Sequence, residues 1–233
     1  MKIALDSGHS LNTLGKRTPD GMREWSFNSV VASHIANELK GYEDVETMRV
    51  DDITGAVDVP LSTRTSKANN EKADVYISVH ANAFGTGGWN NVSGIETFIH
   101  TDASRESAVL AKLVQEELIK STKRSDRSIK SANFAVLRST QMPAILVECG
   151  FMTNKEEATL LKSDAYRKTC AVAITKGIAA MYGLKKKPAP KNAQVYRVLV
   201  DGKQIFALSE KENIIRQLEK HIGSAKEIKL ERI

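Results

Sequence analysis

The chain has 233 residues, 41% of them hydrophobic, so it is long enough to bury one substantial core and to carry a small appendage. Its two cysteines, Cys149 and Cys170, exclude a disulfide framework and favour synthesis inside a cell. No segment is long and apolar enough to span a membrane, and Met1-Lys2 runs directly into a strand, so we expect cytoplasmic synthesis without a signal peptide and no membrane insertion.

Strands and helices alternate along residues 1–184, which predicts an α/β fold with a mostly parallel twisted sheet flanked by helices. Apolar runs of strand length predict strands at 2–6, 45–50, 75–79, 94–99, 133–138 and 144–148. Helical periodicity predicts helices at 24–40, 61–72, 104–120 and 164–182. The Thr-x-x-Glu pattern of Thr153 to Glu156 predicts a further helix directly after the strand that ends at 148.

Four acidic and histidine side chains stand at the ends of these elements, in the order His9, Glu24, His80, Glu148. Taken singly, each has an ordinary interpretation, because Glu24 in a first helical turn suits the helix dipole and Glu148 at a strand end suits a sheet rim. Together they favour a zinc site with a catalytic carboxylate beside it, since ligands collect at the carboxyl ends of parallel strands.

Several motifs follow one another in a specific order: DSGHS, EWSFN, LSTRTSKAN, SVHAN and ANFAVLR…MPAILVECGFMTN. Over residues 1–183 they resemble the amidase-3 family of zinc-dependent N-acetylmuramoyl-L-alanine amidases, from which Ser10 departs because the family more often has glycine there. The resemblance implies that His9, Glu24 and His80 bind Zn²⁺ and that Glu148 is the catalytic base.

The same resemblance implies three substrate-binding residues, Asn82, Arg64 and Lys130. For Arg64, an equal alternative is that it pairs with a structural carboxylate. For Lys130, an equal alternative is a solvated position on the surface. Asp6 either orients His9 or caps its own strand. The glycine-rich loop 83–93 either lines a groove for an extended substrate or is a plain connection.

The expected reaction is therefore hydrolysis of peptidoglycan at the amide between N-acetylmuramic acid and L-alanine of the stem peptide. Without a signal peptide, a phage or prophage endolysin that reaches the wall after release fits best. Two alternatives stay open: a zinc peptidase or deacetylase acting on the wall, and a wall-binding protein without catalysis, against which the intact His-Glu-His-Glu set argues.

Residues 185–192 contain two prolines and four lysines, which predicts a stiff linker between a catalytic domain, 1–184, and a small domain, 193–233. The last part should fold as ββαβ, with strands at 195–200 and 204–208 around Asp201-Gly202, a helix from the capping box 209–212 to 221, and a strand at 227–233.

Residues 185–233 carry 12 basic and 6 acidic residues, whereas residues 1–184 are balanced at 22 of each. The excess suits an anionic wall polymer. Nucleic acid is not expected, because no stacking or nucleic-acid motif accompanies the lysines, and a merely solvated surface is the remaining alternative. The segment VYRVLVDGKQIFALS resembles the short wall-binding modules of Bacillus phage endolysins. A chain this short rarely buries enough surface alone, so self-association or docking on the catalytic domain is expected.

Overall fold

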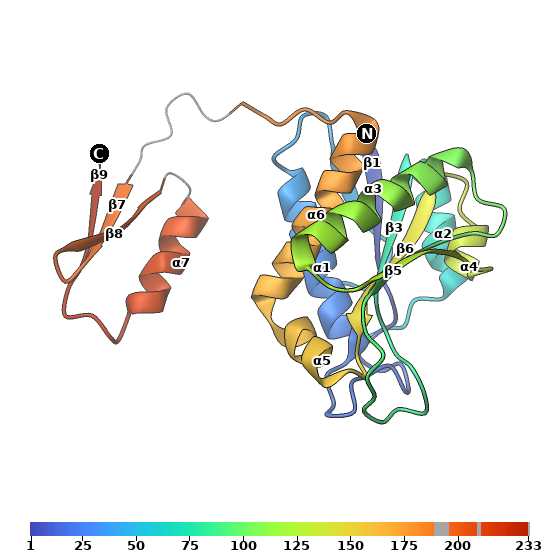
Figure 1. Cartoon of the computed structure of the whole chain (residues 1–233). Helices are drawn as coiled ribbons and strands as arrows, with labels where there is room; N and C mark the ends of the chain where they lie inside the picture. Colours follow the sequence, from blue (N-terminus) through green and yellow to red (C-terminus); the bar gives the residue numbers. More distant parts are fainter. Residues whose placement is uncertain (189–195, 209–210, 233) are drawn as a thin grey trace. The chain divides into compact units, whose positions relative to one another are not determined.

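The computed structural model describes residues 1–188, 196–208 and 211–232 of the chain. The chain divides into two compact units, Met1–Lys186 and Lys187–Ile233 (Figure 1). None of the helices in the described ranges is long and apolar enough to cross a membrane.

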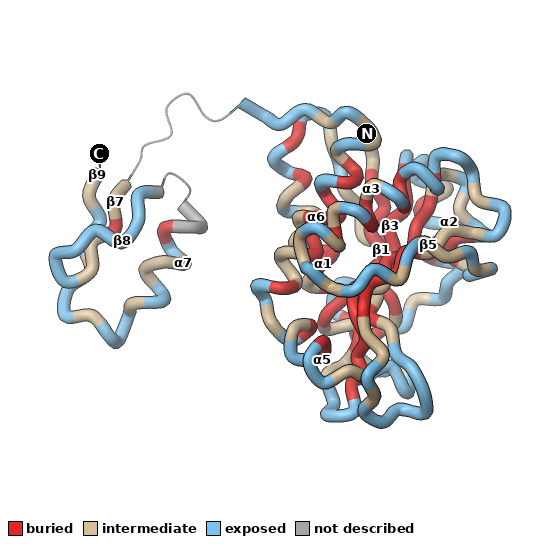
Figure 2. Tube along the Cα trace, viewed as in Figure 1, coloured by how far each residue is buried: buried red, intermediate tan, exposed pale blue. Residues whose placement is uncertain are grey.

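The first unit is built on a six-stranded sheet of order β2-β1-β3-β6-β4-β5. All neighbouring strands are parallel except β4 and β6, so the predicted mostly parallel α/β fold is confirmed. The central strands are deeply buried, as Figure 2 shows. The strands are β1 (Lys2–Ser7), β2 (Glu46–Arg49), β3 (Val75–Asn82), β4 (Ile95–Ile99), β5 (Asp126–Ser131) and β6 (Ala144–Phe151).

Helices cover both faces of this sheet. On one face, α1 (Glu24–Leu39), α3 (Arg105–Thr122), α5 (Lys155–Lys162) and α6 (Asp164–Tyr182) contribute to the larger core cluster, and on the other α2 (Leu61–Asn70) and α4 (Ala135–Arg138) contribute to the smaller one. Cys149 and Cys170 are free thiols in the larger cluster, as expected of small buried apolar side chains.

The predicted helix signals explain most boundaries. The stripe Phe27, Val31, Ile35 and Leu39 of α1 is completely buried. Helix α6 ends at Gly183, whose φ of 60° lies in the left-handed region that terminates helices. Helix α5 begins one residue later than the predicted capping box implies, because Asn154 rather than Thr153 accepts the hydrogen bond of a free helical N–H, that of Glu157.

The prediction of a strand at 133–138 is wrong. Residues 135–138 form the short helix α4, and the edge strand β5 lies earlier, at Asp126–Ser131. Four helical residues give an apolar run that periodicity cannot distinguish from a strand, and β5 is a polar edge strand that lacks an apolar run.

The second unit contains β7 (Tyr196–Val200), β8 (Lys203–Leu208), α7 (Lys211–His221) and β9 (Ile228–Arg232), with an antiparallel sheet of order β8-β7-β9. Asp201 and Gly202 both have positive φ, as a tight hairpin turn requires. The predicted cap at Ser209-Glu210 lies outside the described residues. Lys185 and Lys186 pair with Glu43 and Tyr42, so the first unit extends two residues into the predicted linker.

Candidate functional site

The four residues of the predicted set meet at the carboxyl ends of three neighbouring parallel strands. His9 follows β1, His80 lies near the end of β3, and Glu148 lies on β6 directly opposite His80 in the strand register. Glu24, the first residue of α1, joins them because its backbone N–H donates to the carbonyl of Lys16 at 3.0 Å, which folds the intervening loop back. The edge of a parallel sheet thus collects residues that are far apart in sequence.

His9, Glu24 and His80 form a compact set of ligand atoms that lie within 4.8 Å of one another. Glu24 Oε2 is 3.3 Å from His9 Nε2, and Glu24 Oε1 is 2.9 Å from His80 Nδ1. Asn28 Nδ2 and the Ala81 N–H also donate to Glu24 Oε1, which fixes the carboxylate. Two imidazoles and one carboxylate are a ligand set of catalytic zinc sites.

The backbone around His9 is shaped for this arrangement. His9 has a φ of 67°, a left-handed conformation that costs energy for a residue with a Cβ. Such strain is retained at functional sites, where the surrounding structure imposes it. Here it brings the His9 ring edge-on to the His80 ring, with the ring centroids 5.1 Å apart.

The electrostatics of the three candidate ligands are asymmetric. Burial lowers the pKa of His9 to about 4, against the attraction of Glu24. Burial alone would lower the pKa of His80 and raise that of Glu24, but their mutual hydrogen bond and charges outweigh it, so the pKa of His80 rises and that of Glu24 falls. An ionised Glu24 and a neutral His9 are the protonation states that metal binding requires.

Glu148 faces the same space with an oxygen that nothing in the described residues satisfies. Its Oε2 is buried and has no hydrogen-bond partner. Burial, with the charge of Glu24, raises the pKa of Glu148 to about 8, although the neighbouring His80 lowers it. A buried carboxylate oxygen is costly unless a water, an ion or another group pairs with it. The arrangement therefore fits zinc and its water.

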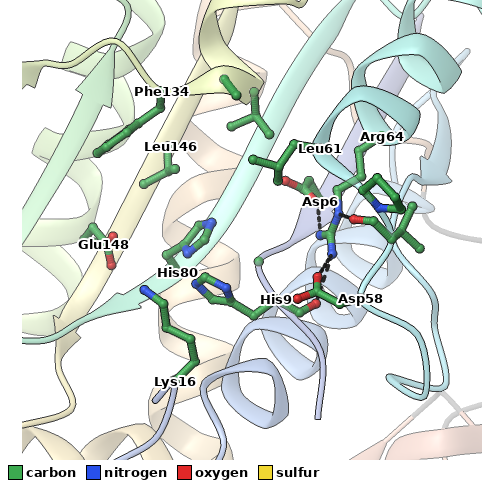
Figure 3. A pocket seen from close by; sticks show the side chains of 15 residues that line it. Asp6, His9, Lys16, Asp58, Leu61, Arg64, His80, Phe134, Leu146 and Glu148 are labelled. Atoms are coloured by element: carbon green, nitrogen blue, oxygen red, sulfur yellow. Dashed lines mark hydrogen bonds and ion pairs between the residues drawn. The ribbon is translucent and has the colours of Figure 1, made fainter. Parts of the chain in front are cut away.

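Two cavities open onto this cluster and share Lys16, His80 and Glu148. The larger one, of about 540 Å³, extends over apolar side chains of α2, α4 and β6, and the smaller one, of about 240 Å³, extends towards Asn82 and Met152. In Figure 3 the side chain of Lys16 lies beside Glu148 and the two histidines. Sequence reasoning missed Lys16, since a lysine in a polar loop carries no signal of its own.

Two roles were open for Arg64. The structure supports pairing with a structural carboxylate and contradicts the prediction that Arg64 binds substrate. The side chain is 1% exposed. Its five N–H groups donate to Asp6 Oδ1, to the carbonyls of Ser7, His9 and Val59, and to Asp58 Oδ1, which leaves none for a substrate. Asp6 accepts from Arg64 and Ser78, so it does not orient the His9 ring as one interpretation supposed.

Asn82 and Lys130 lie near the site but are held by a residue that sequence reasoning missed, Glu96 on β4. Its carboxylate, 4% exposed, accepts from Asn82 Nδ2, Lys130 Nζ and Arg127 Nε. Glu96 lies directly opposite Glu148 on the neighbouring strand. Binding of substrate by Asn82 and Lys130 stays a prediction. An acidic residue inside the apolar run Ile95 to Ile99 was the available signal, since a buried charge needs partners.

The matches to known proteins cover most of the first unit. The family model Amidase_3, described as N-acetylmuramoyl-L-alanine amidase, matches residues 3–180. The N-acetylmuramoyl-L-alanine amidase CwlM of Bacillus licheniformis is 33% identical, over 81% of this chain and 72% of its own. The endolysin of Bacillus phage SPP1 is 34% identical, over 81% and 70%. The crystal structure of an N-acetylmuramoyl-L-alanine amidase from Clostridium difficile 630, 33% identical, has a TM-score of 0.73 and covers 78% of this chain and 96% of that one.

Proposed function

Since this chain belongs to the Amidase_3 family of N-acetylmuramoyl-L-alanine amidases, we propose that it hydrolyses peptidoglycan with zinc held by His9, Glu24 and His80. The bond cleaved is the amide that joins N-acetylmuramic acid to L-alanine of the stem peptide. The observation that carries the zinc proposal is the three-residue ligand cluster beside the unsatisfied oxygen of Glu148.

Each residue of the cluster has a separate task. Bound zinc would supply an activated water and polarise the scissile carbonyl. Glu148 accepts the proton of the attacking water and delivers it to the leaving alanine nitrogen. Its pKa is raised to about 8 in the metal-free protein, and bound zinc would lower that pKa towards the ionised form that a base needs near neutral pH. Asn28 and the Ala81 N–H hold Glu24 in place, and apolar side chains of the larger cavity lie beside the reacting groups.

Metal analysis combined with substitution tests this assignment. Purified protein should contain about one zinc per chain. His9→Ala, Glu24→Ala and His80→Ala should each lose zinc and activity together, whereas Glu148→Gln should keep zinc and lose turnover by several orders of magnitude. His34→Ala is the matched control, because His34 lies on α1 and pairs with Asp164 outside the cluster. Full activity without metal would refute the zinc assignment. Loss of zinc in Glu148→Gln would mean that Glu148 is itself a ligand.

Mass spectrometry of digested peptidoglycan distinguishes an amidase from a zinc peptidase or deacetylase. Release of intact stem peptides with a new N-terminal alanine is the expected product. Shortened stems would identify a peptidase, and glycan that has lost only acetyl groups would identify a deacetylase.

For the biological setting we propose an endolysin, made in the host cytoplasm and acting on the wall after release. Similarity to the SPP1 endolysin supports this, although the relatives also include bacterial amidases. Expression alone should leave bacteria intact, and co-expression with a hole-forming membrane protein should lyse them. Lysis without that protein would mean that the enzyme reaches the wall by itself.

For residues 187–233 we propose binding to an anionic wall polymer. The basic excess of this part of the chain supports the proposal.

A further inference from the structure

Trp89 is partly exposed on the loop between β3 and β4. The chain has two tryptophans. Trp25 is half-buried with its indole nitrogen out of solvent, whereas Trp89 is 38% exposed. A single exposed apolar side chain is common on protein surfaces, but a ring that lines a cavity can be buried by a ligand that enters it.

Trp89 lines a separate cavity of about 420 Å³ together with Asn90, Asn91, Asn154, Lys155 and Glu156. Part of this lining is fixed by the fold. The N–H of Asn90 donates to the carbonyl of Thr153, and its side-chain amide donates to the carbonyl of Phe84. The loop is therefore anchored to the segment that follows β6, and the cavity is preformed.

Other polar groups of the lining are unused. Within the described residues, the Trp89 indole N–H, the Asn91 amide and the Asn154 Nδ2 have no hydrogen-bond partner, although Asn154 Oδ1 caps α5. Glu156 is neutralised by Arg124 at 2.7 Å, and the Lys155 ammonium lies over the Trp89 ring at 6.0 Å from its centroid. The cavity thus offers an aromatic ring, neutral hydrogen-bonding groups and one cation, the Lys155 ammonium.

The cavity belongs to the same rim as the candidate zinc site. The Met152 N–H donates to the carbonyl of Asn82 at 2.6 Å, and the Phe84 N–H donates to Thr153 Oγ1 at 3.0 Å. Asn82 and Met152 line the smaller of the two catalytic cavities, together with Glu148. The two segments that bound the catalytic cavity therefore continue directly into the tryptophan cavity.

We propose that the tryptophan cavity binds a sugar ring of the glycan strand, within a chain of β-1,4-linked N-acetylated amino sugars. The C–H face of a pyranose stacks on an aromatic ring, and its hydroxyl and acetamido groups pair with side-chain amides. A stem peptide fits less well, because its carboxylates would seek more than one unpaired cation. The inference rests on the proposed function, since it concerns the polymer that carries the scissile amide.

Intrinsic fluorescence tests binding without requiring catalysis. In Trp25→Phe the single remaining tryptophan is Trp89, and N-acetylchitotetraose, which has the amino-sugar backbone but no lactyl group or peptide, is the probe. A saturable change in emission, with and without zinc, is expected. Calorimetry should show loss of binding in Trp89→Ala, partial retention in Trp89→Phe and unchanged binding in Phe84→Ala, an exposed aromatic of the same loop outside the cavity.

Kinetics then separate this inference from the zinc assignment. The preference of the enzyme for polymeric peptidoglycan over a single N-acetylmuramoyl peptide should fall roughly 3- to 10-fold in Trp89→Ala, through KM rather than kcat, as one aromatic contact is worth. If Trp89 emission does not change with the probe, or if Trp89→Ala loses equal activity on both substrates, the glycan subsite is refuted and the amidase assignment stands. A wild-type enzyme that binds no zinc, or that cleaves neither substrate, would instead refute the proposed mechanism.

Discussion

Gly8 lies directly against the imidazole of His80: a Cβ added to Gly8 would come within 2.0 Å of His80 Cε1. Its backbone conformation suits any residue, so the need for glycine here is one of space alone. Gly8→Ala should therefore displace the His80 ring and weaken zinc binding by about 10- to 100-fold, the loss typical when a ligand loses its orientation. Zinc titration against a competing chelator measures this.

Gly88→Ala is the control, because Gly88 also has an ordinary φ and nothing lies within 4 Å of its added Cβ. Circular dichroism should show that both variants fold. Unchanged zinc affinity in Gly8→Ala would show that the His80 ring can move without consequence, and would weaken its assignment as a ligand.

The buried ion pair between Arg64 and Asp6, 2.6 Å apart, gives the second prediction. Arg64→Met leaves the Asp6 charge buried without its partner and should lower the free energy of unfolding by about 3–5 kcal/mol. Adding Asp6→Asn should recover part of this loss, because the unpaired charge is then removed. Urea denaturation measures both, with Lys67→Met on the exposed side of α2 as control, since it loses only one exposed hydrogen bond, to the Arg49 carbonyl. A rise in KM at unchanged stability would restore the substrate-binding role.

Arg64 also shows where sequence reasoning reaches its limit. Except for β5, the strands could be predicted, as could the large helices and the meeting of two histidines and two glutamates at the strand ends, because apolar periodicity and ordered motifs are local patterns. The partners of Arg64 come from β1, the loop after it and residues 58 and 59, and only the folded chain brings these together. The same holds for Glu96, which joins side chains from β3 and β5 that no local pattern connects.

The raised pKa of Glu148 predicts how stability varies with pH in metal-free protein. Below about pH 4.5 the carboxyl is protonated in both states, and between about 4.5 and 8 it ionises only in the unfolded chain. The folded state then binds more protons, so stability falls as pH rises through this window. Glu148→Gln does not titrate, so its stability relative to wild type should rise by a few kcal/mol between pH 5 and 8.5.

Urea denaturation of chelator-treated proteins at pH 5, 7 and 8.5 measures this difference. Zinc should reduce it, since a nearby cation stabilises the carboxylate. A difference that is constant with pH would mean that Glu148 is already ionised in the folded, metal-free protein, and its role as proton acceptor would then rest on geometry alone.

Truncation tests the division of labour between the two units. A chain ending at Lys186 should fold, keep its zinc and cleave soluble wall fragments, because every proposed catalytic residue lies before the cut, but it should bind intact walls poorly. A chain ending at Leu184 loses the pairing of Lys185 and Lys186 with Glu43 and Tyr42 and should be less stable by about 1 kcal/mol. Wall sedimentation assays and thermal unfolding measure these effects. Lysis of whole cells by the shorter chain as well as by the full one would make the second unit dispensable.

The second unit by itself should self-associate. Among its described side chains only two apolar ones, Val198 and Ile214, are buried, whereas Ile205, Phe206, Ile215, Ile222 and Leu230 remain at least 38% exposed. So small a core rarely sustains a fold of this length, and pairing of two copies would supply the missing burial. Residues 187–233 fused to a monomeric fluorescent carrier should sediment as a dimer at micromolar concentration and dissociate on dilution. Phe206→Ser should shift this equilibrium towards monomer, and Lys203→Ser, on the same strand β8, should not.

Wall binding should weaken with salt if the lysines meet an anionic polymer, and it should fall in Phe206→Ser if the dimer is the binding form. A folded unit that is monomeric at every concentration and still binds walls would show that its small core suffices.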